Sequence, residues 1–212
     1  MSALSFAVAG ARAERFAAVP TLVLRLRITE AAGEHVQAIA LRAQVQLEPQ
    51  RRRYDAEESS RLVELFGAPE RYGQTLRPLL WTSVSQTVPA FDGTTEADLT
   101  LPLSYDFEVA AHKYLAALRD GEIPLALLFS GMVFVQGEHG VWSELVPWSC
   151  EARYRLPVAV WREAIDVCFP GTAWIRIDRA LFDELSRFKN AHGLATWDAA
   201  LARLCETART AP

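Results

Sequence analysis

Residues 21–49 read TLVLRLRITEAAGEHVQAIALRAQVQLEP and contain two runs in which apolar and polar side chains alternate. Every second residue is Leu or Ile in residues 22–28, and every second residue is apolar in residues 39–47. A period of two is typical of strands that bury one face. The connection at residues 31–34 is short and contains Gly33, so we expect the two strands to pair as an antiparallel hairpin.

Apolar stretches on both sides of this segment extend the β prediction. Residues 1–20 are rich in Ala, and we expect a loose N-terminal arm or an edge strand around residues 4–8. Alternating or continuous apolar runs predict further strands at residues 79–88, 99–107, 124–135 and 141–156. In the strand at residues 141–156, we expect the large side chains of Trp148 and Tyr154 to be buried anchors.

Two helices are predicted within the β region, near residues 55–66 and 108–118. Asp55 and Glu58 have the N-cap and N3 spacing of a capping box with Asp in place of Ser or Thr. Apolar residues change to helical spacing in residues 157–208, so this part of the chain is expected to be helical.

The order of these elements predicts an α+β fold: an antiparallel sheet of about six strands with inserted helices and a helical C-terminal third. We expect residues 21–156 to form the mostly antiparallel β core and residues 157–208 to add a helical part to the same domain. Within that part, the spacing places two sets of residues on inward faces: Leu181, Leu185 and Phe188 in one helix, and Leu201, Leu204 and Cys205 in the next.

The composition of the 212-residue chain excludes several classes of protein. Half of the residues are hydrophobic and 23% are charged, which is unlike a disordered chain, and 11 Gly and 11 Pro are too few for collagen. A pI near 5.6 argues against a generally basic nucleic-acid binder. No apolar run approaches the roughly 20 residues of a membrane-spanning helix, so no membrane insertion is expected.

The cysteines and the N-terminus favour the cytoplasm. The chain has three cysteines, widely spaced and without a CxxC pair, which argues against a disulfide framework or a structural zinc site. No basic segment followed by an apolar one marks a secretory signal at the N-terminus. We therefore expect a cytoplasmic protein.

The net charge of −4 is unevenly distributed along the chain. Residues 1–53 contain eight Arg and four Glu, a net of +4, so the remaining 159 residues sum to −8. This asymmetry predicts an uneven surface field.

The sharpest local feature is the run Arg51, Arg52 and Arg53 followed by Tyr54, between a strand end and a capped helix. In one interpretation these arginines pair with acidic neighbours at the start of the following helix. In the other they bind an acidic protein surface or a phosphate, because the Arg guanidinium bonds carboxylates and phosphates in a bidentate manner.

No motif of a known catalytic or cofactor site is present. GxGxxG, the P-loop, HExxH and GxSxG are all missing from the sequence, so no catalytic residue and no cofactor is predicted. Ser130 precedes Gly131 but lacks the upstream Gly of a nucleophile elbow. A Ser-Gly within an apolar strand is more often a bulge or a point of close packing.

One group of residues remains as a candidate for metal binding or acid–base chemistry. Glu108 and His112 are four residues apart, on one face of a predicted helix, and Asp106 lies just upstream. A metal site needs at least three protein ligands or an open coordination position, and no second pair of ligands is visible. A hydrogen bond between Glu108 and His112 on a solvated face is the alternative.

Six tryptophans are many for this length, and aromatic side chains dominate both cores and interfaces. Trp142 and Trp174 lie beside predicted turns. If either is exposed, we expect it to contribute to a partner-binding surface.

Six segments of the chain are distinctive when taken together: QVQLEPQRRRY at 44–54, LRPLLW at 76–81, YDFE at 105–108, EIPLALLFSG at 122–131, YRLPVAVW at 154–161 and TWDAA at 196–200. Together they resemble an uncharacterised, mostly actinobacterial protein family defined only as a domain of unknown function. The resemblance implies no catalytic residues. Members look to be encoded near [NiFe]-hydrogenase genes, which implies an accessory or maturation role.

Three functions follow from these observations. The leading hypothesis is a non-enzymatic accessory or assembly protein, with hydrogenase components as the partners that the resemblance implies. The second is a small enzyme or metal carrier that uses Asp106, Glu108 and His112. The third is a chaperone that binds apolar segments.

Overall fold

The structure is a computed structural model that describes residues 3–103, 109–137, 140–172, 175 and 177–210. The chain divides into two compact units, Met1–Trp174 and Ile175–Pro212. The expectation that residues 157–208 form part of one domain stays a prediction.

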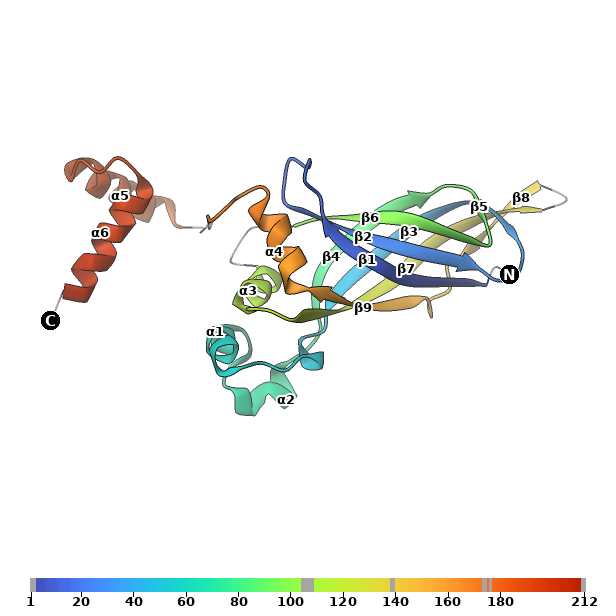
Figure 1. Cartoon of the computed structure of the whole chain (residues 1–212), viewed down its shortest axis with the longest axis horizontal. Helices are drawn as coiled ribbons and strands as arrows, with labels where there is room; N and C mark the ends of the chain where they lie inside the picture. Colours follow the sequence, from blue (N-terminus) through green and yellow to red (C-terminus); the bar gives the residue numbers. More distant parts are fainter. Residues whose placement is uncertain (1–2, 104–108, 138–139, 173–174, 176, 211–212) are drawn as a thin grey trace. The chain divides into compact units, whose positions relative to one another are not determined.

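The first unit confirms the α+β prediction, because its strands form antiparallel sheets and helices are inserted between them (Figure 1). Its first five strands and first helices are β1 (Leu4–Ala13), β2 (Thr21–Glu30), β3 (His35–Leu47), α1 (Ala56–Phe66), α2 (Tyr72–Thr75), β4 (Leu79–Val88) and β5 (Phe91–Asp92). They are followed by β6 (Thr94–Pro102), α3 (Ala110–Ala117), β7 (Glu122–Gly137), β8 (Gly140–Leu145), β9 (Glu151–Pro157) and α4 (Val158–Asp166). The short 3-10 helices are η1 (Pro49–Arg51), which precedes α1, and η2 (Pro69–Arg71), which precedes α2.

The strands are divided between two sheets that enclose one hydrophobic core. The first sheet has the order β1-β2-β6. The second has the order β4-β3-β7-β8, with β5 paired to β3 and β9 paired to β7. The ring of Phe6 on β1 stacks on the ring of Phe129 on β7, with centroids 4.3 Å apart, so the sheets face each other as a sandwich.

The predicted hairpin of residues 22–28 and 39–47 is wrong. β2 pairs with β1 and β6 in one sheet, whereas β3 pairs with β4, β5 and β7 in the other. The short connection at residues 31–34 therefore carries the chain from one sheet to the other. Alternation indicates that each strand buries one face, and both sheets of a sandwich satisfy that condition, so the pattern does not identify the neighbouring strand.

Glu30 fixes this crossover from inside the protein. Its side chain is 3% exposed and accepts hydrogen bonds from the backbone amides of Ala3 at 3.0 Å, Ala32 at 2.9 Å and Glu34 at 2.9 Å. Burial alone would raise the pKa of this carboxyl, but the amide donors outweigh it and lower the pKa below its usual value. The charged form of Glu30 thus joins the N-terminus to the turn between the sheets.

We expect Glu30→Gln to lower the free energy of unfolding at neutral pH by about 1–3 kcal/mol, because a charged acceptor of several amides is lost. A depressed folded-state pKa gives stability that is present above the unfolded pKa and disappears as the pH falls through the folded value. Denaturant unfolding of the wild type should therefore show a loss of stability as the pH falls below about 5. The variant should lack the part of this loss that comes from protonation of Glu30. The exposed Glu70→Gln variant is the control. Parallel pH profiles for wild type and Glu30→Gln would contradict the prediction.

The helix predicted near residues 55–66 is confirmed as α1. Asp55 is its N-cap, and one carboxylate oxygen accepts a hydrogen bond from the backbone amide of Glu58 at 2.7 Å. The second predicted helix corresponds to α3, and the strand predicted over residues 99–107 corresponds to the second half of β6. The expected end of that strand, residues 104–107, and the expected start of the helix at residue 108 lie outside the described residues. Helices α1 to α4 lie at the end of the sandwich opposite β8 (Figure 1).

The strand predicted over residues 141–156 is two strands, β8 and β9, with a turn between them. Trp148 lies in this turn and is 95% exposed, so the prediction that it is a buried anchor is wrong. The physical reason is that β7 exchanges its partner at this point, from β9 to β8, and the connecting residues leave the sheet. Tyr154, on β9, is partly buried against the core.

The second unit contains α5 (Arg179–Ala191) and α6 (Trp197–Thr210). The rings of Phe182 and Trp197 connect the two helices, with centroids 5.0 Å apart. Leu181 is 48% exposed, Leu201 is 39% exposed and Cys205 is exposed, so the inward placement predicted for these residues is wrong. Among the residues that the structure describes, no helix is long and apolar enough to span a membrane.

Candidate functional site

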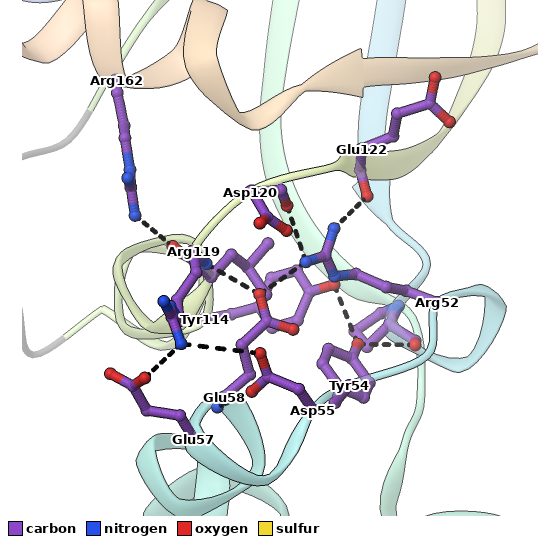
Figure 2. A network of polar contacts seen from close by, with 12 residues as sticks. Arg52, Tyr54, Asp55, Glu57, Glu58, Tyr114, Arg119, Asp120, Glu122 and Arg162 are labelled. Carbon is purple, nitrogen blue, oxygen red and sulfur yellow. Dashed lines mark hydrogen bonds and ion pairs between the residues drawn. The ribbon is translucent and has the colours of Figure 1, made fainter.

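The three adjacent arginines have different environments, and Arg52 is the one that turns into the protein. Its side chain is 9% exposed and forms an ion pair with Glu58, which is 4% exposed, at 2.6 Å. The same guanidinium donates to the backbone carbonyls of Asp120 at 2.8 Å and Glu122 at 2.7 Å. Figure 2 shows these contacts converging on one side chain from α1 and from residues 120–122.

Two tyrosines complete this network (Figure 2). The hydroxyl of Tyr54 donates to the carbonyl of Pro49 at 2.7 Å and is 3.0 Å from the hydroxyl of Tyr114. Burial, partly offset by the hydrogen bond with Tyr54, raises the pKa of Tyr114 to about 12. The hydroxyls therefore stay protonated at neutral pH, and the network connects η1, α1 and α3 with the start of β7.

The other two arginines face the solvent. Arg51 is 48% exposed and pairs with Glu48 at 2.9 Å, and Arg53 is exposed. Internal pairing thus applies to Arg51 and Arg52, and a partner that approaches this corner would meet Arg51 and Arg53. A partner-binding role for the corner stays a prediction.

The candidate metal group is only partly described. Asp106 and Glu108 lie outside the described residues. His112 is buried on α3, and its ring centroid is 5.8 Å from that of Trp161. A cavity of about 90 Å³ lies beside these two rings. Within the described part of the chain, no group of three or more His, Cys, Asp or Glu side chains is placed to hold a metal ion.

The exposed apolar residues of the first unit include a group on β8 and the turn that follows it. Val141 is 53% exposed, Leu145 is 75% exposed and Trp148 is 95% exposed. Trp142, also on β8, is 41% exposed and donates from Nε1 to Glu144 at 3.1 Å. Its ring occupies the space beside Gly137 that a larger residue would fill, because a Cβ there would lie 2.2 Å from the ring.

The structure does not bring the predicted partner-binding residues together. Trp142 on β8 lies opposite Val135 on β7, and Val135 lies opposite Val36 near the start of β3. Arg51 and Arg53 follow the other end of β3. The 13 residues of β3 separate the two by about 40 Å. Trp174 lies outside the described residues.

Comparison with known proteins identifies the family. A family model described as a family of unknown function, DUF6084, matches residues 1–212. The chain belongs to DUF6084. No curated protein matches this DUF6084 chain.

Three solved structures with a low similarity to the DUF6084 chain are β-glucosidases. Glucosidase 3B from Thermotoga neapolitana, in complex with α-D-glucose, is 9% identical and has a TM-score of 0.26. The enzyme from Kluyveromyces marxianus is 6% identical, with a TM-score of 0.27 for a selenomethionine form and 0.24 for a glucose complex. The matches cover 73% of this chain but only 15–17% of those proteins, and TM-scores this low do not establish a shared fold.

The predictions from the sequence do not include the exposure of Leu145 and Trp148 in this DUF6084 chain. Both lie in a continuous apolar run, Leu145, Val146, Pro147 and Trp148, which is also typical of a buried strand. The available signal was Pro147, because proline cannot donate to a central ladder and usually marks the end of a strand.

Proposed function

We propose that this DUF6084 chain is a non-enzymatic accessory protein that acts by binding another protein through the β8 surface, defined as Val141, Trp142, Leu145 and Trp148. The observation that supports it is the exposure of Leu145 at 75% and Trp148 at 95%, close together in the sequence. Large apolar side chains that are exposed close together in the chain are unfavourable in water, and such groups mark sites of protein interaction.

The position of β8 in its sheet supports a specific mode of binding. In the described structure β8 pairs with β7, at the end of the order β4-β3-β7-β8. An edge strand presents backbone donors and acceptors that an added strand of a partner can satisfy. The alternating side chains of β8 would then contact the partner on both faces of the extended sheet.

The partner that we propose is a component of a [NiFe] hydrogenase. The support is the resemblance to a family whose members look to be encoded near hydrogenase genes. Arg51 and Arg53, at the opposite end of β3, are proposed as a second contact for acidic groups, because Arg pairs well with carboxylates.

Affinity purification of the chain from its native host should recover hydrogenase components, identified by mass spectrometry. The double variant Leu145→Ser and Trp148→Ala should weaken binding to the purified component by at least about 30-fold, the effect of one interface hot spot. Its unfolding midpoint should stay near that of the wild type, because both side chains are exposed.

The matched control is Leu80→Ser on β4, the opposite edge of the same sheet, where Leu80 is 57% exposed. This variant should bind as the wild type does. Recovery of the wild-type chain alone under gentle, low-salt conditions would contradict the proposed function. Equal binding by the double variant would exclude the β8 surface as the site.

A further inference from the structure

The described residues of the α5–α6 unit form almost no core of their own. The unit spans 38 residues, and in its described part only Ala200 is buried. Globular units below about 40 residues usually need a disulfide, a metal or association with another chain. The unit has one cysteine, Cys205, and it is free. An association that covers the apolar faces of these helices is therefore expected.

One face of α6 has the composition of an interface. Leu201 and Cys205 are four residues apart, so they lie on the same side of the helix, and both are exposed. Asp198 lies near the start of this face and Arg209 near its end, with separations of three or four residues between successive positions. The face is thus apolar in the middle, negative at one end and positive at the other.

This distribution of charge is complementary to itself. When two identical helices pack antiparallel around a twofold axis, the start of one lies against the end of the other. Asp198 would then lie beside Arg209 of the partner subunit, and the reciprocal pair would form at the other end. Leu201 would lie over Cys205 of the partner subunit in the middle of the contact.

The net charge of the unit also fits a second copy. Residues 175–212 contain six Arg or Lys and five Asp or Glu, so the unit is nearly neutral. A strongly charged partner would be expected to select a surface of the opposite sign. We propose that the α5–α6 unit makes the protein a homodimer, with the α6 face formed by Asp198, Leu201, Cys205 and Arg209 as the contact.

Sedimentation equilibrium of the 212-residue chain over a concentration series tests the proposal. The wild type should have twice the chain mass of 23.6 kDa. Leu201→Glu places a like charge at both symmetric positions and should raise the dimer dissociation constant by at least about 30-fold. Arg203→Gln is the control, because residue 203 lies on the opposite side of α6, and it should leave the dissociation constant unchanged.

Charge reversal tests the antiparallel arrangement. Asp198→Arg makes both ends of the face positive and Arg209→Asp makes both ends negative, so each variant alone should dimerise roughly tenfold more weakly than the wild type. An equimolar mixture of the two variants should form heterodimers and recover the wild-type dissociation constant. A wild-type chain that stays monomeric at every concentration, as it would if α5 and α6 packed on their own first unit, overturns the proposal. A mixture that associates no better than the single variants overturns it as well.

Discussion

Arg52→Ala is expected to lower the free energy of unfolding by about 3–5 kcal/mol, because it leaves the buried carboxylate of Glu58 without its ion-pair partner. The same change removes the donors to the carbonyls of Asp120 and Glu122, which attach α3 and β7 to η1. Arg52→Lys should recover only part of the loss, since a single ammonium cannot reproduce the planar set of donors that reaches three acceptors.

Urea unfolding, monitored by tryptophan fluorescence, measures these changes. Arg53→Ala is the matched control, one residue away and exposed, and it should alter the unfolding free energy by less than about 0.5 kcal/mol. Arg51→Ala should lose at most about 1 kcal/mol, because its side chain is half exposed beside Glu48. Equal losses for Arg52→Ala and Arg53→Ala would mean that the Arg52 network does not stabilise the fold.

Gly131→Ala is expected to lower the free energy of unfolding by at least about 3 kcal/mol. Gly131 has a φ of +136°, and a Cβ at this position would lie 2.0 Å from the carbonyl oxygen of Ala40 on the neighbouring strand β3. The clash involves backbone atoms in the middle of the β3–β7 ladder, so relief requires the two strands to separate. The amide of Val146 also donates to the carbonyl of Gly131 at 3.0 Å, which places the turn after β8.

Thermal unfolding followed by circular dichroism measures the effect, and soluble yield records a complete failure to fold. Gly10→Ala on β1 is the control, because nothing lies within 4 Å of a Cβ built there, and its midpoint should stay close to that of the wild type. Similar midpoints for the two variants would contradict the prediction, because they would show that β3 and β7 accommodate a Cβ at residue 131 without a loss of stability.

The sequence predicted the fold class and many elements because local patterns determine them. The alternation in residues 22–28 and 39–47 identifies strands with one buried face, and the Asp55 cap identifies the start of α1. The assignment of strands to two sheets could not be read from these patterns, because it depends on pairs distant in the chain. Thr21 on β2, for example, lies opposite Pro102 on β6.

The candidate site shows the same division. The interpretation of Arg51, Arg52 and Arg53 requires knowing which of them can reach the carbonyls after α3, and these lie 68 and 70 residues from Arg52. Three identical side chains in succession carry no local signal of this difference. The exposure of Trp148 likewise has no clear local signal, because a turn between two apolar strands can itself be apolar.

The pairing of β2 with β6 has a consequence for how the protein is made. While the ribosome synthesises the chain, β1 and β2 can form a hairpin early, but the outer edge of β2 stays open until β6 has emerged. The apolar face of the hairpin stays exposed for longer, because Phe6 is covered by Phe129, which is translated more than a hundred residues later. Folds dominated by such distant pairs close slowly, on a scale of milliseconds to seconds. During synthesis there is therefore a period in which the apolar face of β1 and β2 is exposed to solvent because the second sheet has not yet formed.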